Sequence, residues 1–170
     1  MELEVEVAID APAATAWAVI GEQFGRIGEW ATPITSSRLD REPGIGAVRD
    51  CHIARFGPVK PGVVRERLIL FDPAAMSFAY EAVDGMPKFV ARAINRWSVE
   101  PLDSHRCVVR MRATLELRGW ARLFGFLLGP RMQRDGARVL EELRYQAEHG
   151  IPHPRKRRAM ARRNAATVRG

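Results

Sequence analysis

The stretch that decides the fold is residues 119–150, GWARLFGFLLGPRMQRDGARVLEELRYQAEHG. Its apolar residues recur at helical spacing, at Trp120, Phe124, Leu127, Leu128, Met132, Val139 and Leu143. A long helix with one apolar face needs a second layer to cover that face. Nearly everything before it alternates apolar and polar residues with a period of two, which predicts strands. Pro130 within the stretch predicts a kink or a brief interruption.

The strand and helix signals in chain order predict an α+β domain. Residues 2–9 alternate strictly. Asp10 is expected to cap a helix that carries Pro12 in its first turn, and a short second helix follows near 26–29. Six more strands are expected at 34–40, 46–54, 62–71, 75–83, 87–99 and 105–117. Short turns between them require antiparallel pairing. We therefore expect a curved seven-stranded antiparallel sheet that wraps the long C-terminal helix and leaves a cleft between them.

Length and composition place the chain among single-domain globular proteins. At 170 residues one domain is expected. Cys51 and Cys107 lie in apolar strands, so we expect two reduced thiols and not a disulfide framework. The start, MELEVEVAID, shows no signal peptide, and no apolar run reaches the length of a membrane span. These features predict a cytoplasmic protein.

The net charge of +7 is concentrated at the C-terminus. Residues 152–170 hold seven basic residues and no acidic one, so residues 1–151 are neutral overall. Pro152 and Pro154 stop the long helix. We expect a ligand-binding domain over 1–150 and a basic, flexible tail over 151–170. The tail predicts either a solubilising end or weak contact with an anionic membrane or nucleic acid through 155–169.

Two neighbouring strands each carry one charged residue on the face predicted to point inward. Arg49 shares its face with Cys51, and Glu66 shares its face with Val64 and Leu68. Because these strands are consecutive, Arg49 and Glu66 are expected to pair. One interpretation is a buried ion pair without a ligand. The other is the polar end of a pocket, where a carbonyl, hydroxyl or carboxylate of a ligand binds.

The remaining lining is predicted from strand alternation and from the helix. Small inward residues, among them Ala91, Ala93 and Ala113, leave volume that a solid core would fill. The candidate ligand-binding residues are Arg49, Cys51, Glu66, Leu68, Phe78, Tyr80, Asn95, Trp97, Val109, Met111, Phe124, Leu128 and Met132.

Motifs for metals and cofactors are not found. The four histidines are scattered, and no CxxC, GxSxG, P-loop or GxGxxG motif occurs. We therefore expect neither a metal nor a cofactor.

The order of elements and several local motifs resemble the START/birch-pollen-allergen-like superfamily (SRPBCC), and most closely its polyketide cyclase/dehydrase and lipid-transport group. The resemblance covers about residues 2–149 and rests on APAATAWAVIGEQFGRIGEW, PGIGAVRD, VRERLILFDP, SFAYEAVDG, NRWSVEP and VLEELRYQAE. It implies the helix-grip fold, with two short helices after the first strand. In the plant-hormone-receptor branch, the residues equivalent to Glu66 and Tyr80 contact the ligand, and residues 84–88 correspond to a gating loop. The characteristic residues of that gate are absent here.

The resemblance leaves three functions open. We expect binding of a small hydrophobic or amphipathic molecule, such as a lipid, polyketide or isoprenoid, without catalysis. The alternative is a polyketide cyclase, aromatase or dehydratase in which Glu66, with Arg49 or Tyr80, moves a proton. The third is a membrane or nucleic-acid adaptor that uses the basic tail. Neither the ligand nor the oligomeric state follows from the sequence.

Overall fold

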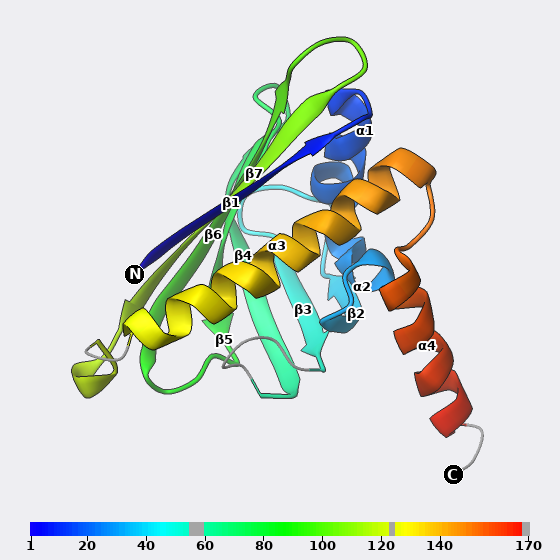
Figure 1. Cartoon of the computed structure of the whole chain (residues 1–170). Helices are drawn as coiled ribbons and strands as arrows, with labels where there is room; N and C mark the ends of the chain where they lie inside the picture. Colours follow the sequence, from blue (N-terminus) through cyan, green and yellow to red (C-terminus); the bar gives the residue numbers. More distant parts are fainter. Residues whose placement is uncertain (55–59, 123–124, 168–170) are drawn as a thin grey trace.

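The structure is a computed structural model that describes residues 1–54, 60–122 and 125–167. Its strands are β1 Glu2–Ile9, β2 Ile34–Leu39, β3 Val48–Ile53, β4 Gly62–Asp72, β5 Ser77–Asp84, β6 Val90–Pro101 and β7 Cys107–Leu117. Its helices are α1 Ala13–Trp17, α2 Ile27–Trp30, α3 Gly125–His149 and α4 Pro154–Thr167, with short helical turns at η1 Ala18–Glu22, η2 Phe24–Arg26 and η3 Gly119–Arg122. Figure 1 shows α3 lying across the sheet and α4 beside α2 and β2.

The seven strands form one sheet in the order β1-β7-β6-β5-β4-β3-β2, and every neighbouring pair is antiparallel. The α+β helix-grip architecture expected from the sequence is therefore confirmed. The first strand of the chain, β1, pairs with the last strand, β7, and α3 packs against the concave face of the sheet.

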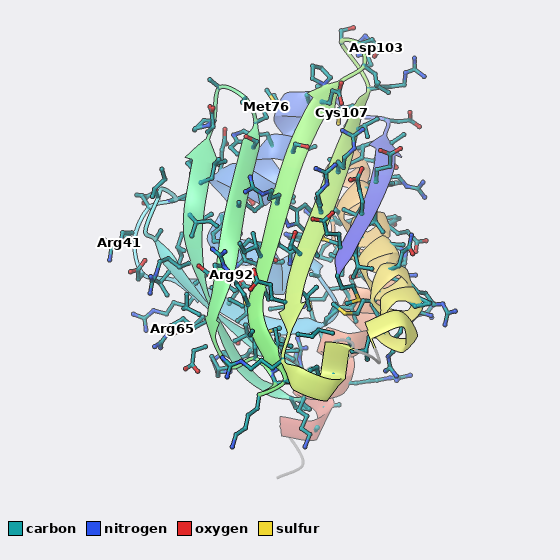
Figure 2. The ribbon with its side chains drawn as sticks, turned by 90° about the vertical axis from the view of Figure 1, so that its left-hand side faces the viewer. Arg41, Arg65, Met76, Arg92, Asp103 and Cys107 are labelled. Carbon is teal, nitrogen blue, oxygen red and sulfur yellow. The ribbon has the colours of Figure 1, made fainter. Side chains whose placement is uncertain are left out.

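The outer face of the sheet carries pairs of opposite charge, as Figure 2 shows for the surface around Arg65 and Arg92. Arg65 pairs with Asp50, and Arg92 pairs with Glu81. These exposed pairs each stabilise the fold by about 0–1 kcal/mol. Their main consequence is to fix which face of each strand is wet, so that the opposite face supplies the core.

The core lies between the sheet, the short helices and the C-terminal half of α3. Trp17 and Phe24 pack against Phe78, and Val139, Leu140 and Leu143 of α3 are buried with them. At Gly136 the helix approaches the sheet closely, because a Cβ there would lie 2.9 Å from Met111 Cε. The lack of a side chain at this position therefore sets the separation of α3 from the sheet.

Three expectations about helices are corrected by the structure. The long helix does not start at Gly119, where a left-handed residue (φ +51°) and the turn η3 precede α3. It is also not interrupted at Pro130, because α3 runs from Gly125 to His149 as one helix. Asp10 does not cap α1, since the helix starts at Ala13, its N-cap residue is Pro12 and no side chain bonds its first amides.

Ala91 of β6 was expected to point inward, but the structure places it on the exposed face. The register between β6 and β7 shifts between Val90 and Arg92, so Val90 is buried and Ala91 is exposed. One irregular residue moves the neighbouring side chains to the opposite face. Beyond the shift, Trp97 and Val99 point inward as expected.

The flexible tail expected from residue 151 is also corrected, because Pro154–Thr167 form α4 and this helix is docked. Lys156 is fully buried, and its Nζ donates to the carbonyl oxygens of Ala31 (3.0 Å) and Ile34 (2.6 Å). Arg155 pairs with Glu141 and Glu142 of α3. Composition alone predicted a solvated tail, but buried hydrogen bonds of its cations hold it in place.

Candidate functional site: a cavity between the sheet and the helices

A partly open cavity of about 140 Å³ lies between the concave face of the sheet, the α2–β2 segment and α3. Its wall is mostly apolar. It brings together seven of the residues predicted from the sequence, namely Cys51, Glu66, Tyr80, Asn95, Trp97, Met111 and Met132. An apolar hollow with a few convergent polar groups is the usual form of a small-molecule site.

The predicted pair of Arg49 and Glu66 exists, and it stands at one end of this cavity. The two residues lie opposite each other on β3 and β4. Arg49 Nε and Nη2 both donate to Glu66 Oε2, at 2.8 and 2.6 Å, and Nη1 donates to the Phe24 carbonyl oxygen at 2.5 Å. The Arg49 guanidinium also lies 3.6 Å from the centre of the Phe24 ring. Arg49 thus stands behind Glu66, and Glu66 forms the cavity wall.

The charge of this pair is fixed by its surroundings. Burial alone would lower the pKa of Arg49, but the Glu66 carboxylate, together with Cys51 and Tyr80, outweighs burial and holds that pKa above its ordinary value. Cys51 Sγ lies 3.4 Å from the same oxygen, Glu66 Oε2. Burial raises the pKa of the Cys51 thiol well above its usual range, so the thiol stays protonated. Among the described residues, no group donates a hydrogen bond to the other oxygen, Glu66 Oε1.

A second polar pair lies on the next two strands of the sheet, beside the pair of Arg49 and Glu66. Tyr80 and Asn95 lie opposite each other on β5 and β6, and Asn95 Nδ2 donates to Tyr80 Oη at 3.1 Å. Asn95 Oδ1 is buried and has no partner in the described part of the chain. Burial, reinforced by the nearby Glu66 charge, raises the pKa of Tyr80, so its hydroxyl remains a donor at neutral pH.

Comparison with known families decides the assignment. The family model described as polyketide cyclase/dehydrase and lipid transport matches residues 1–148. The chain belongs to this family. The resemblance inferred from the sequence is thereby confirmed, and the family and fold support ligand binding or a polyketide cyclase-type role. No curated protein matches the chain.

Solved structures of other proteins share the fold of this polyketide cyclase/dehydrase family member. The Zhui aromatase/cyclase from Streptomyces sp. R1128 superposes with a TM-score of 0.67 at 20% identity, over 90% of this chain and 99% of that one. A norcoclaurine synthase point mutant from Thalictrum flavum, in complex with a transition-state analogue, gives 0.62 at 15% identity over 86% and 94%. A protein from Thermobifida fusca gives 0.63 at 26% identity over 89% and 97%.

Several predicted lining residues of this family member lie elsewhere. Leu68, Phe78 and Val109 are buried in the core and are not on the cavity wall. They sit on the half of the sheet that is filled by the short helices, where Trp17 and Phe24 take up the space. Leu128 also does not line the cavity, and Phe124 lies outside the described residues.

The sequence interpretation missed a whole side of the wall. Ile27, Ala31, Pro33 and Ile34, from α2 to the start of β2, close the cavity opposite the centre of the sheet. No periodic pattern marks this segment, so the sequence held no signal for its direction. Leu3 and Val5 also line the cavity, and the alternation of the first strand could have identified both.

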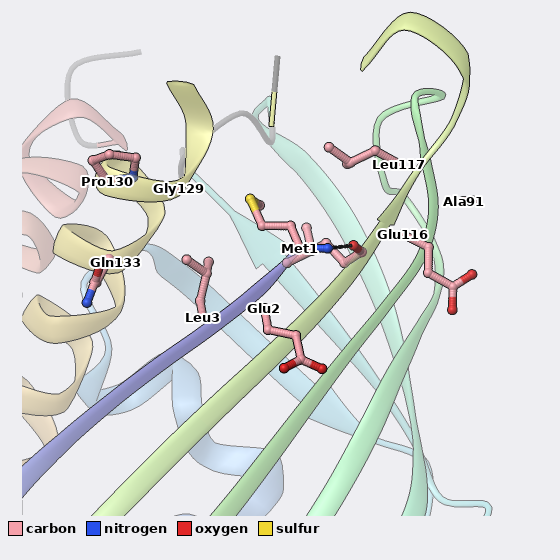
Figure 3. A pocket seen from close by; sticks show the side chains of 10 residues that line it. Met1, Glu2, Leu3, Ala91, Glu116, Leu117, Gly129, Pro130 and Gln133 are labelled. Carbon is pink, nitrogen blue, oxygen red and sulfur yellow. Dashed lines mark hydrogen bonds between the residues drawn. The ribbon is translucent and has the colours of Figure 1, made fainter. Parts of the chain in front are cut away.

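An open groove of about 760 Å³ adjoins the cavity on its β1 side (Figure 3). It lies between the start of β1, the end of β7 and the segment Gly129–Gln133 of α3. Leu3, Leu115 and Gln133 belong to the walls of both hollows. The cavity of this family member therefore borders a larger surface groove.

Within residues 1–54, 60–122 and 125–167, no three His, Cys, Asp or Glu side chains cluster closely enough to hold a metal ion. None of the described helices is both long and apolar enough to cross a bilayer.

Proposed function

We propose that this protein binds a small hydrophobic or amphipathic molecule in the cavity, with the polar group of the ligand at Glu66, Tyr80 and Asn95. The observation that carries the proposal is a pair of acceptors beside an otherwise apolar hollow: Asn95 Oδ1 is buried without a partner, and the hydrogen bonds of Glu66 in the described part of the chain all end on Oε2, which leaves Oε1 free. Buried polar atoms are nearly always hydrogen-bonded, so acceptors left free in a cavity indicate a missing partner.

Binding without reaction is favoured by the protonation states of the wall. The raised pKa values of Cys51 and Tyr80 keep both groups neutral, so neither is an activated nucleophile. Glu66 is held by the Arg49 guanidinium on one oxygen, which stabilises its charge. These features suit recognition of a polar group in a dry site.

A polyketide cyclase-type reaction is the second candidate, and the free oxygen of Glu66 favours it. A carboxylate oxygen that faces the ligand can accept a proton, and the Tyr80 hydroxyl can donate one. The similarity to the Zhui aromatase/cyclase supports this candidate at the level of fold. The cavity volume of about 140 Å³ is below the usual range of ligand sites, about 300–1,000 Å³. A poly-ketone chain would therefore have to extend into the groove.

Native mass spectrometry of the purified protein tests the binding proposal directly. A co-purifying small molecule that is absent after denaturation supports it, and its mass gives the ligand. Supplying poly-β-ketone analogues to the ligand-free protein then separates the two candidates. Cyclised product that is lost in the Glu66→Gln variant would establish the enzyme, whereas binding with no product would establish the carrier.

A further inference from the structure

We propose that the polar end of the cavity recognises an un-ionised hydroxyl group, as in an alcohol or a phenol, and excludes carboxylates. This inference rests on the proposed binding function and narrows it to one class of ligand. It follows from which hydrogen-bonding atoms at this end are already used and which are left.

The only cation at this end, among the described residues that surround it, is already paired with the Glu66 carboxylate. The side chain of Arg49 is 3% exposed, and its contacts run to Glu66 Oε2 and to the Phe24 carbonyl. Lys156 lies on the far side of the segment 31–34, where it donates to two backbone carbonyls. A ligand carboxylate would therefore find no free counterion in this part of the molecule, and burying it would cost free energy.

Two acceptors at this end of the cavity receive no hydrogen bond from the described residues. Glu66 Oε1 carries negative charge, and Asn95 Oδ1 is a buried carbonyl oxygen without a partner. Reversing the Asn95 amide would let the Tyr80 hydroxyl donate to Oδ1, and it would leave Glu66 Oε1 unchanged. The strongest free group is thus an anionic acceptor, which attracts a donor and repels a second anion.

Two donors complete the arrangement: the Tyr80 hydroxyl and the Trp97 indole N–H, which is buried and has no partner in the described part of the chain. Tyr80 Oη accepts from Asn95, and the described residues offer no acceptor for its own hydrogen. A ligand hydroxyl is both donor and acceptor, so it can donate to Glu66 Oε1 and accept from Tyr80. An ether can only accept, and a carboxylate brings a like charge next to Glu66.

The cavity volume limits the part of the ligand that carries this hydroxyl. About 140 Å³ is close to the size of an engineered protein cavity that binds benzene. One ring therefore fills the cavity, and any further length must pass Leu3, Leu115 and Gln133 into the groove.

Three matched probes test the inference by calorimetry at neutral pH: para-ethylphenol, para-ethylanisole and para-ethylbenzoate. We expect the phenol to bind, the methyl ether to bind about tenfold more weakly for the lost bond to a charged acceptor, and the benzoate to show no measurable binding. Glu66→Gln should cancel the preference and admit the benzoate, because Arg49 then lacks its counter-charge. The exposed Glu100→Gln is the matched control and should change nothing.

Tyr80→Phe provides a second variant if Glu66→Gln fails to fold. It removes only the Tyr80 hydroxyl and leaves Glu66 in place, so it should weaken phenol binding several-fold and still exclude the benzoate. Benzoate binding as tight as phenol binding in the wild-type protein would overturn the selectivity and leave the proposed binding function intact. Equal binding of the ether and the phenol would overturn the hydroxyl recognition. If none of the three binds, the proposed binding function itself fails.

Discussion

Arg49 and Glu66 face each other across β3 and β4, and both guanidinium–carboxylate bonds end on one oxygen, Glu66 Oε2. The pairing neutralises two buried charges while it leaves the second carboxylate oxygen for the cavity. Oε2 of Glu66 thus stabilises the buried charge of Arg49, while Oε1 is available to a ligand. Substitutions can separate these two roles.

Replacing Arg49 by Met leaves Glu66 as an uncompensated buried charge. We expect the free energy of unfolding, measured by urea denaturation, to fall by about 3–5 kcal/mol. The double variant Arg49→Met/Glu66→Leu removes both charges and should recover most of that loss, because an apolar pair of similar volume is often neutral. A double variant as unstable as the single one would show that packing and not charge holds this site together.

Lys156 should make stability depend on pH in the alkaline range. Burial lowers its pKa from 10.5 to about 8. Between these values the unfolded chain binds more protons than the folded one, so the stability that Lys156 confers rises as the pH rises from about 8 to 10.5. Below about 8 both states are protonated, and its contribution stays constant.

The measurement is the difference in unfolding free energy between the wild-type protein and Lys156→Met across that range. We expect the difference to grow with pH. Arg158→Met removes one charge from the exposed side of the same helix, and its difference in unfolding free energy should not change with pH. If the difference for Lys156→Met also stays constant with pH, the Lys156 amine is not buried in solution.

Two glycines of α3 offer a matched test of how closely the helix packs on the sheet. Outside its chain neighbours, a Cβ at Gly129 meets nothing closer than 3.9 Å, but it crowds the ring of Pro130, so Gly129→Ala should stabilise the protein by less than the roughly 0.8–1.0 kcal/mol of helix propensity alone. A Cβ at Gly136 lies 2.9 Å from Met111 Cε, which must move. Gly136→Ala should lose that gain and, because Met111 lines the cavity, weaken para-ethylphenol binding. Thermal unfolding and calorimetry of both variants check this, and equal stabilisation would contradict it.

Strand alternation predicted the sheet and the buried pair because both depend on local patterns. Arg49 and Glu66 were recognisable because a period of two places them on the inner faces of consecutive strands. The other wall of the cavity was not predictable in this way. Ala31 and Ile34 take their direction from long-range hydrogen bonds to Lys156, 125 and 122 residues further along the chain. Likewise the irregular register at Val90 has no signature in the residues themselves, so Ala91 was assigned to the wrong face.

The docking of α4 predicts that the C-terminal helix supports the cavity wall from outside. Glu142 of α3 holds Thr32 through both its backbone amide and its hydroxyl, each at 2.7 Å, and Lys156 holds the carbonyls on either side. Deleting residues 152–170 removes Lys156 from these carbonyls and Arg155 from Glu142. We expect faster hydrogen exchange at the amides of Ala31, Thr32 and Ile34, with weaker para-ethylphenol binding.

The triple variant Arg157→Gln/Arg158→Gln/Arg162→Gln is the control for this deletion. It removes three charges from the exposed side of α4 and leaves the contacts of Arg155 and Lys156 in place. Exchange at Thr32 and Ile34 should then match the wild-type protein. If the deletion leaves exchange unchanged, α4 does not support the wall. If the triple variant accelerates exchange as much as the deletion does, the overall charge of the helix, and not the buried bonds of Lys156, holds it against the segment 31–34.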